Sequence, residues 1–187
     1  MEKLTKPQRD EKRRKEIVSA AKKCVTEHGF HSTSVAMIAK EAGINVGQLY
    51  RYFDTKEDII EAISEDVFAR NVSNFKSHGD FISGVLAQKE DGVIMMEIHS
   101  EVNRNPKVDK IMQKAEKKMS AFILNEIKKT APNLTEEEAQ MQEAIMMVLT
   151  GGLGMFAAHK KRAWPKAKIQ KLAQHMFSKL LPDLNKK

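Results

Sequence analysis

The stretch "GINVGQLYRYFDTKEDI", residues 43–59, contains both tyrosines of the chain, Tyr50 and Tyr52. They flank Arg51, and Lys56 follows one helical turn later. A phenol carries a hydroxyl donor on a rigid ring, which suits it to a phosphate oxygen, and the two cations add positive charge beside it. The stretch therefore suggests a surface that binds a polyanion, although both tyrosines could instead be half-buried core residues with their hydroxyls in water.

The same stretch belongs to a pattern typical of a helix-turn-helix. A short helix is expected at about residues 34–42, Gly43 breaks the chain, and a second short helix is expected at about residues 46–53. Gly47 has no side chain, so the backbone can approach base edges or phosphates closely there. Two short helices joined by a glycine-containing turn can place the second helix in the major groove of DNA.

Helical periodicity continues along the chain, and no run alternates in the manner of strands joined by hairpin turns. A first helix is expected between Pro7 and Gly29. A long helix should begin near Lys56, because Thr55 and Asp58 form a capping box. Further helices are expected at about residues 80–88, 91–104, 106–131 and 135–158, the last of these capped by Thr135 and Glu138, and after Pro165. The predicted fold class is all-α, with a three-helix domain at residues 1–56 and a helical bundle at residues 57–187.

Charge is unevenly distributed over the 187 residues, whose formal net charge is +7. Residues 1–56 hold 12 Lys and Arg against 7 Asp and Glu, residues 57–158 hold 11 against 17, and residues 159–187 hold 9 against 1. A basic first segment suits a polyanionic partner. The more basic tail leaves open an alternative, a helical adaptor that binds acidic proteins or a membrane surface.

Several classes of protein are excluded by what the sequence lacks. The single cysteine, Cys24, excludes an internal disulfide and fits the cytoplasm, as does the charged N-terminus without a secretory segment. The longest apolar run, residues 144–158, is shorter than the roughly 20 residues that a membrane helix needs. No nucleophile elbow, paired-carboxylate signature or phosphate loop is found, so we expect no enzyme and no cofactor. Cys24, His28 and His31 lack a fourth ligand for zinc, so no metal is expected.

A longer stretch, "GFHSTSVAMIAKEAGINVGQLYRYFDTKEDI", residues 29–59, resembles the DNA-binding segment of the tetracycline-repressor (TetR) family of bacterial transcriptional regulators. The matching features are "TSVxxIA", the "AG" turn, "GxLYxYF" and the closing "KE". By this resemblance the DNA-binding positions are Thr33, Ser34, Asn45, Val46, Gly47, Tyr50, Arg51, Tyr52 and Lys56, with Thr33 expected either at a helix cap or at a phosphate. Val46 departs from the polar or basic residue that is frequent there, and it could contact a thymine methyl group instead.

The resemblance implies a homodimeric, cytoplasmic repressor that binds a pseudopalindromic operator in double-stranded DNA and is released by a small-molecule effector. Activation by the same fold is the alternative, since the outcome depends on where the site lies relative to the promoter. The basic run "KRRK", residues 12–15, either forms a solvated face or binds backbone phosphate.

The domain at residues 57–187 is expected to bind the effector and to form the dimer. The apolar run 144–158 is the candidate interface, together with the last helix, unless it lies inside a monomeric bundle; the interface residues expected are Gly151, Gly154, Ala158, Leu172 and Met176. Eleven methionines suit an adaptable apolar pocket as well as ordinary core filling. The pocket residues expected are Phe68, His99, Phe122 and Met147. The acidic middle segment favours a cationic amphiphile, unless its charge belongs only to the surface.

Overall fold

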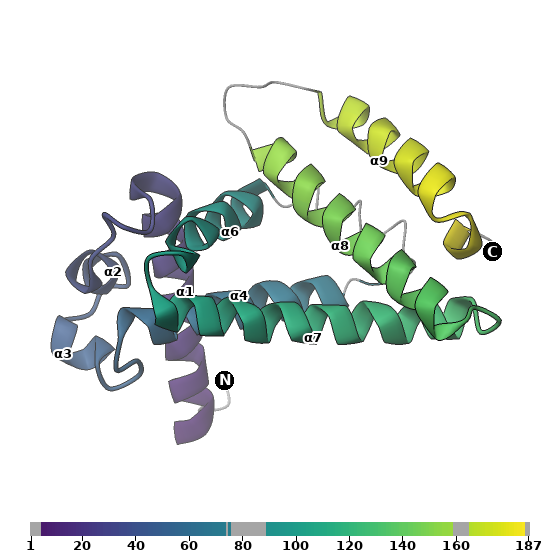
Figure 1. Ribbon diagram of the computed structural model, residues 1–187. Helices are drawn as coiled ribbons and strands as arrows, with labels where there is room; N and C mark the ends of the chain where they lie inside the picture. The colour runs from purple at the N-terminus through teal and green to yellow at the C-terminus, as the bar shows by residue number, and fades with distance from the viewer. Residues whose placement is uncertain (1–4, 74, 76–88, 159–164, 186–187) are drawn as a thin grey trace. The chain divides into compact units, whose positions relative to one another are not determined.

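The computed structural model describes residues 5–73, 75, 89–158 and 165–185, and every regular element within these ranges is helical (Figure 1). The predicted all-α class is therefore confirmed. In chain order the elements are α1 (Lys6–His28), α2 (Val35–Glu41), α3 (Val46–Leu49), α4 (Lys56–Ser73), α6 (Lys89–Val102), α7 (Pro106–Thr130), α8 (Glu136–Ala158), α9 (Lys166–Leu180) and the 3-10 helix η1 (Pro182–Asn185). The helix expected at about residues 80–88 lies outside the described residues.

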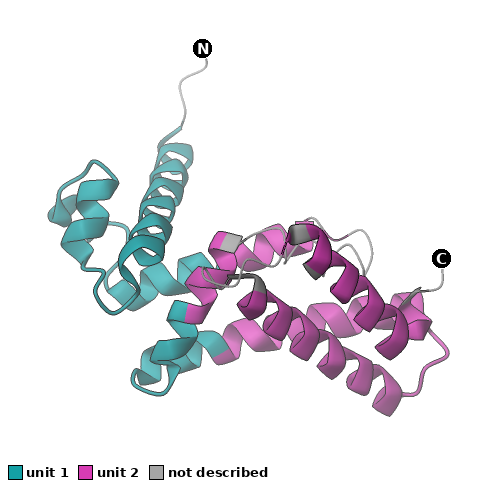
Figure 2. Ribbon diagram, turned by 90° about the horizontal axis from the view of Figure 1, so that it is seen from above, with its two compact units in different colours: residues 1–66, 97–112 teal, residues 67–96, 113–187 magenta. Residues whose placement is uncertain are grey.

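The chain forms two compact units (Figure 2). Unit 1 contains residues 1–66 and 97–112, and unit 2 contains residues 67–96 and 113–187. Helices α4, α6 and α7 each begin in one unit and end in the other. The two compact units do not show which residues bind DNA and which bind an effector. The expected boundary between a DNA-binding domain and an effector domain, after residue 56, therefore stays a prediction.

The elements of unit 1 begin and end at capping residues. Helix α1 starts where Thr5 and Gln8 cap one another, and it ends at Gly29, whose positive φ of 79° stops the helix. Its apolar positions recur at helical spacing and are buried: Ile17, Val18, Ala20, Ala21, Cys24 and Val25. Because this face packs against α2, α1 holds the helix-turn-helix to the rest of the unit.

The two capping boxes expected from the sequence are confirmed. At the start of α4 the Asp58 N–H donates to the Thr55 hydroxyl at 3.2 Å, and the Thr55 N–H donates to the Asp58 carboxylate at 2.7 Å. Thr135 and Glu138 form the same pair of bonds at the start of α8. These contacts satisfy backbone N–H groups that the first helical turn leaves without a partner.

Unit 2 is built around an apolar core to which α7, α8, α9 and η1 contribute. Its buried members are Ile123, Ile127, Ala139, Met146, Leu149, Leu153, Ala173, Phe177, Leu181 and Leu184. Helices α8 and α9 pack side by side, as Figure 1 also shows. The core therefore depends on residues that recur every three or four positions along three helices.

Candidate nucleic-acid interface

Helices α2 and α3 form the expected helix-turn-helix, with Gly43 at the turn. The Ser34 hydroxyl caps α2 by accepting a hydrogen bond from the Met37 N–H at 3.2 Å. Gly43 has a φ of +66°, a region that side chains disfavour, and the Ile44 N–H then reaches the Ala39 carbonyl at 3.0 Å. The turn is therefore fixed by the backbone conformation that glycine allows, and α2 packs against α3.

Helix α3 is shorter than the expected span of about 46–53, since regular helix covers only Val46–Leu49. After it, the Arg51 and Tyr52 N–H groups bond three residues back, at 3.2 and 2.9 Å, which tightens the last turn. The helix begins at Asn45, whose side chain accepts from the Gln48 N–H at 2.8 Å. A helix this short is not stable by itself, so its position depends on packing and on contacts at both of its ends.

One set of motif residues is exposed, and we call it the outer face. It consists of Ser34, Asn45, Val46, Gly47, Tyr50 and Arg51. Tyr50 is 49% exposed and Val46 38%. In the part of the chain that the structure describes, the Tyr50 hydroxyl and the Arg51 guanidinium make no hydrogen bond or ion pair, so both can meet phosphate or base edges.

Gly47 on the outer face has room for a side chain within the protein itself. A Cβ atom built there would meet only the Asn45 Oδ1 atom, at 3.4 Å, an ordinary contact distance. The fold therefore does not require glycine at this position. A close approach of the backbone to an external partner stays the expected reason for it.

A second set of motif residues has partners inside unit 1, and we call it the inner face: Thr33, Leu49, Tyr52, Phe53 and Lys56. Leu49 and Phe53 are buried core residues. Thr33 is 2% exposed, and its hydroxyl donates to the Gly29 carbonyl at 2.7 Å. The Tyr52 hydroxyl donates to the Asp10 carboxylate of α1 at 3.4 Å. The expected phosphate contacts of Thr33 and Tyr52 therefore stay predictions that this geometry disfavours.

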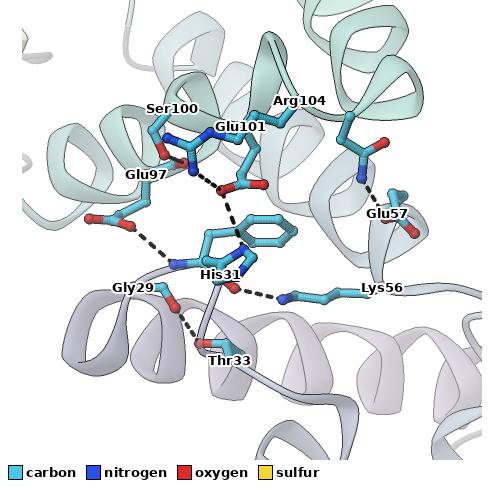
Figure 3. A network of polar contacts seen from close by, with 11 residues as sticks. Gly29, His31, Thr33, Lys56, Glu57, Glu97, Ser100, Glu101 and Arg104 are labelled. Atoms are coloured by element: carbon cyan, nitrogen blue, oxygen red, sulfur yellow. Dashed lines mark hydrogen bonds and ion pairs between the residues drawn. The ribbon is translucent and has the colours of Figure 1, made fainter.

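The phosphate contact expected of Lys56 also stays a prediction that the geometry disfavours. The Lys56 ammonium donates to the Phe30 carbonyl at 2.6 Å and lies 4.0 Å from the centre of the Phe30 ring (Figure 3). Burial lowers the pKa of Lys56, while the carboxylates of Glu101 and Glu57 act in the opposite direction. The cation thus ties the start of α4 to the segment before α2, and it is engaged within the protein.

The same segment is held from the C-terminal end of α6 (Figure 3). A Glu97 carboxylate oxygen accepts from the Phe30 N–H at 3.1 Å and would lie 2.9 Å from a Cβ atom at Gly29. Glu101 is buried and lies 3.8 Å from His31 and 3.6 Å from Arg104. Both backbone polar groups of Phe30 are therefore bound by side chains from other helices.

The basic run 12–15 has two different roles. Arg13 and Lys15 pair with glutamates on α1 itself, at 2.7 and 3.5 Å, as expected of a solvated face. Arg14 instead donates to the Tyr52 carbonyl at 2.5 Å and lies 4.2 Å from the centre of the Phe53 ring.

Sequence reasoning missed two residues of this region, Gln48 and Asp10, and it missed the contact that Arg14 of the basic run makes with Tyr52. Gln48 is exposed on α3, and its side chain accepts from the Asn45 N–H at 3.1 Å. The Asn45-x-x-Gln48 spacing is a capping signal that could have revealed it. Asp10 and Arg14 had no such signal, because their partners lie about forty positions along the chain.

The expected effector residues are only partly brought together. Phe122 makes edge-to-face contacts with Phe68 and Phe75 in unit 2, with ring centres 6.4 and 5.2 Å apart. Met147 is partly buried against the core of unit 2. His99 is exposed and belongs to unit 1, so its place in the same pocket stays a prediction.

The expected dimer residues also differ in exposure. Gly151 is exposed and Gly154 is half-buried, whereas Leu172 and Met176 pack partly buried against the core of unit 2. The Ala158 side chain lies outside the described residues. Three large apolar side chains on α8 are exposed: Met141 (60%), Val148 (73%) and Met155 (57%), of which Val148 and Met155 lie within the expected run 144–158.

Neither a membrane-spanning helix nor a metal-binding group is found among the described residues. None of their helices combines the length and apolar content that crossing a membrane requires. No group of three or more His, Cys, Asp or Glu among them is arranged to hold a metal ion.

Comparisons with known proteins agree with the helix-turn-helix. Residues 17–63 match the sequence model of bacterial regulatory proteins of the tetR family. The HTH-type transcriptional regulator UidR of Escherichia coli strain K12 is 30% identical over 121 residues, which are 59% of this chain and 62% of UidR. The chain therefore spans less than two thirds of the length of this relative.

Solved structures extend the likeness of fold. Salmonella enterica GusR has a TM-score of 0.74 at 23% identity, over 97% of this chain and 100% of GusR. A Saccharomonospora viridis protein described as a transcriptional regulator, in complex with choline, has a TM-score of 0.67 at 16% identity, over 88% and 95% of the two chains. Residues 17–63, which contain the helix-turn-helix, therefore match bacterial regulatory proteins of the tetR family, and the chain as a whole shares the fold of these solved structures.

Proposed function

We propose that this protein is a cytoplasmic transcriptional repressor that binds operator DNA as a homodimer and releases it when a small hydrophobic molecule binds in unit 2. The observation that carries the proposal is the outer face, whose Tyr50 and Arg51 side chains are exposed and have no partner within the described residues. Unpaired donors directly after a short helix suit the major groove, where Tyr50 would meet phosphate and Arg51 a guanine edge or phosphate. Val46 would make apolar contact with a thymine methyl group.

Exposed apolar side chains on α8 support the dimer. Met141, Val148 and Met155 recur every seven residues, so they share one side of the helix, and Gly151 has open space around its backbone. Large apolar side chains in line are unusual on a monomeric surface. A second copy of α8 would cover them, and two copies related by a two-fold axis would present two copies of α3 to a two-fold DNA site.

Aromatic side chains in unit 2 support a hydrophobic effector, and they make a cationic amphiphile the first class to test. Phe68, Phe75 and Phe122 are partly buried. Phe68 and Phe75 each contact Phe122 edge to face, and ring faces attract cations. The similar fold from Saccharomonospora viridis was solved with choline, a quaternary ammonium compound. An effector that binds one arrangement of the dimer better would change the distance between the two α3 helices and weaken DNA binding.

Selection of bound duplexes from random DNA tests the DNA-binding part of the proposal. We expect enrichment of a two-fold symmetric site whose half-sites lie about one helical turn, roughly 34 Å, or a multiple of it, apart. The matched control is Arg51→Ala, which should lose the enrichment while its unfolding transition stays unchanged. Enrichment of a site without two-fold symmetry, or of no site, would contradict the proposal.

Release of the selected duplex tests the effector. We expect dodecyltrimethylammonium, at concentrations below its micelle formation, to weaken operator binding more than choline does, because its chain buries more apolar surface. Phe122→Leu should reduce this response without changing affinity for DNA alone. Equal operator affinity with and without both cations would contradict a cationic effector, and a neutral or anionic amphiphile would be tested next.

A further inference from the structure

The turn that follows α3 is contacted by Arg14 of α1. Its guanidinium donates to the Tyr52 carbonyl at 2.5 Å and covers the Phe53 ring at 4.2 Å. A hydrogen bond from a charged donor is stronger than one between neutral groups. Helix α3 has a single turn of regular structure, so a contact on the turn directly after it fixes a large part of its position.

The surroundings of Arg14 are acidic. Arg14 borders a cleft of about 230 Å³ that Asp54, Asp58, Glu61 and Glu65 also line. A phosphate placed there would lie among acidic residues. The charge of Arg14 is therefore suited to the carbonyl and the carboxylates of its own unit, and less suited to a DNA phosphate.

A second contact from α1 acts on the same residue of the turn. The Tyr52 hydroxyl donates to the Asp10 carboxylate, one helical turn before Arg14. Both the backbone carbonyl and the side chain of Tyr52 are thus bound to α1. The outer-face residues Tyr50 and Arg51 directly precede Tyr52, so a shift of Tyr52 moves the groups that would bind DNA.

We propose that Arg14 is a positioning residue for the outer face, setting the orientation of Tyr50 and Arg51 through the Tyr52 carbonyl without contacting DNA. The proposal rests on the DNA-binding function. A positioning role predicts that loss of Arg14 weakens specific binding more than non-specific binding. Hydrogen bonds to base edges need a fixed orientation of the protein groups, whereas contacts to phosphates of any sequence tolerate a shifted helix.

The test compares Arg14→Met with Arg13→Met in the full chain. Both variants remove one positive charge from adjacent positions of α1, but the Arg13 side chain pairs with Glu16 and does not contact the α3 turn. Two readouts are used. One is the affinity for the selected duplex and for a scrambled duplex over a range of salt concentrations, at a temperature where both variants are folded. The other is amide hydrogen exchange of residues 49–53.

We expect Arg14→Met to bind the selected duplex about tenfold more weakly than Arg13→Met does. Affinity for the scrambled duplex and the salt dependence should be equal in the two variants. Exchange at residues 49–53 should be several-fold faster in Arg14→Met alone. This last readout needs no DNA, so it tests Arg14 even if the wild-type protein selects no duplex and the proposed function fails.

Two outcomes would overturn the proposal. If the logarithm of affinity for both duplexes depends less steeply on salt in Arg14→Met than in Arg13→Met, by about one unit of slope, Arg14 contacts a phosphate directly. If the two variants agree in affinity and in exchange, Arg14 has no positioning role. Should Arg14→Met fail to fold, Arg14→Gln against Arg13→Gln replaces the pair. The glutamine amide is uncharged and its side chain is shorter than that of arginine, so it cannot replace the guanidinium, and agreement of this pair in both readouts overturns the proposal equally.

Discussion

Tyr50 and Tyr52 are two positions apart, but they lie in different regions of unit 1. Tyr50 belongs to the outer face and is 49% exposed, whereas Tyr52 belongs to the inner face and donates to Asp10 of α1. The cations divide in the same way, since Arg51 is exposed while Lys56 binds the Phe30 carbonyl. One short motif therefore contains residues that can meet DNA and residues that hold the first set in place.

The largest expected difference between the two faces is in stability, when side chains of α3 are replaced by alanine. Leu49→Ala should lower the free energy of unfolding by about 2–5 kcal/mol, because Leu49 is fully buried and its loss leaves a cavity. Val46→Ala should change it by less than about 0.5 kcal/mol. Chemical denaturation followed by circular dichroism measures both. Equal losses of stability in the two variants would show that the outer and inner faces are not distinct.

The two cations of the motif give the next largest difference. Lys56→Met should lower the free energy of unfolding by about 1–2 kcal/mol, because the Phe30 carbonyl loses a charged donor that is half-buried. Its salt dependence of DNA binding should equal that of the wild type. Arg51→Met should show the reverse, with unchanged stability and at least about tenfold weaker binding to the selected duplex. A shallower salt dependence in Lys56→Met would restore the phosphate contact first expected of Lys56.

Removing each phenol hydroxyl sharpens the comparison further. Tyr52→Phe should cost about 0.5–1 kcal/mol of stability, because the Asp10 carboxylate loses its donor. Tyr50→Phe should leave the free energy of unfolding unchanged. It should weaken DNA binding by about threefold to tenfold, because one hydrogen bond to phosphate is lost. Thermal unfolding and duplex titration of both variants are required. A loss of stability in Tyr50→Phe would place its hydroxyl on the inner face.

The smallest expected effect concerns Cys24, whose thiol is buried on α1. Burial raises the pKa of Cys24, and the nearby carboxylates of Glu41 and Glu27 raise it further. The folded state therefore keeps the proton to higher pH than the unfolded chain does. Stability from this group is present below the unfolded pKa of about 8.5 and is lost as the pH rises above it. The fall in unfolding free energy between pH 8 and pH 10 should be smaller in Cys24→Ala, as denaturation at each pH would show, and equal slopes would contradict it.

Local features of unit 1 could be predicted from the sequence. Gly43 marks the turn, and Thr55 with Asp58 marks the start of α4, because in both cases the deciding contact lies within a few residues. The resemblance of "GxLYxYF" to a known family also indicated that Tyr50 and Arg51 lie on the surface, and both side chains are exposed. DNA contact by these residues is still a prediction.

Contacts between distant residues could not be predicted. Lys56 meets Phe30 across 26 positions, and Arg14 meets Tyr52 across 38, so no local spacing indicates either pair. The span of α3 was overestimated because helical periodicity does not show where i→i+3 bonds tighten the last turn. The apolar face of α8 was recognised as a candidate interface, but exposure of Met141, Val148 and Met155 depends on how α9 covers the other side.

Hydroxyl-radical labelling of the two tyrosines, with and without the selected duplex, tests most directly whether the outer face binds DNA. We expect Tyr50 to react readily in the free protein and to be strongly protected by the duplex, while Tyr52 reacts slowly in both states. Were Tyr50 to react equally fast with and without bound DNA, the surface that reads the duplex would have to lie elsewhere on the chain.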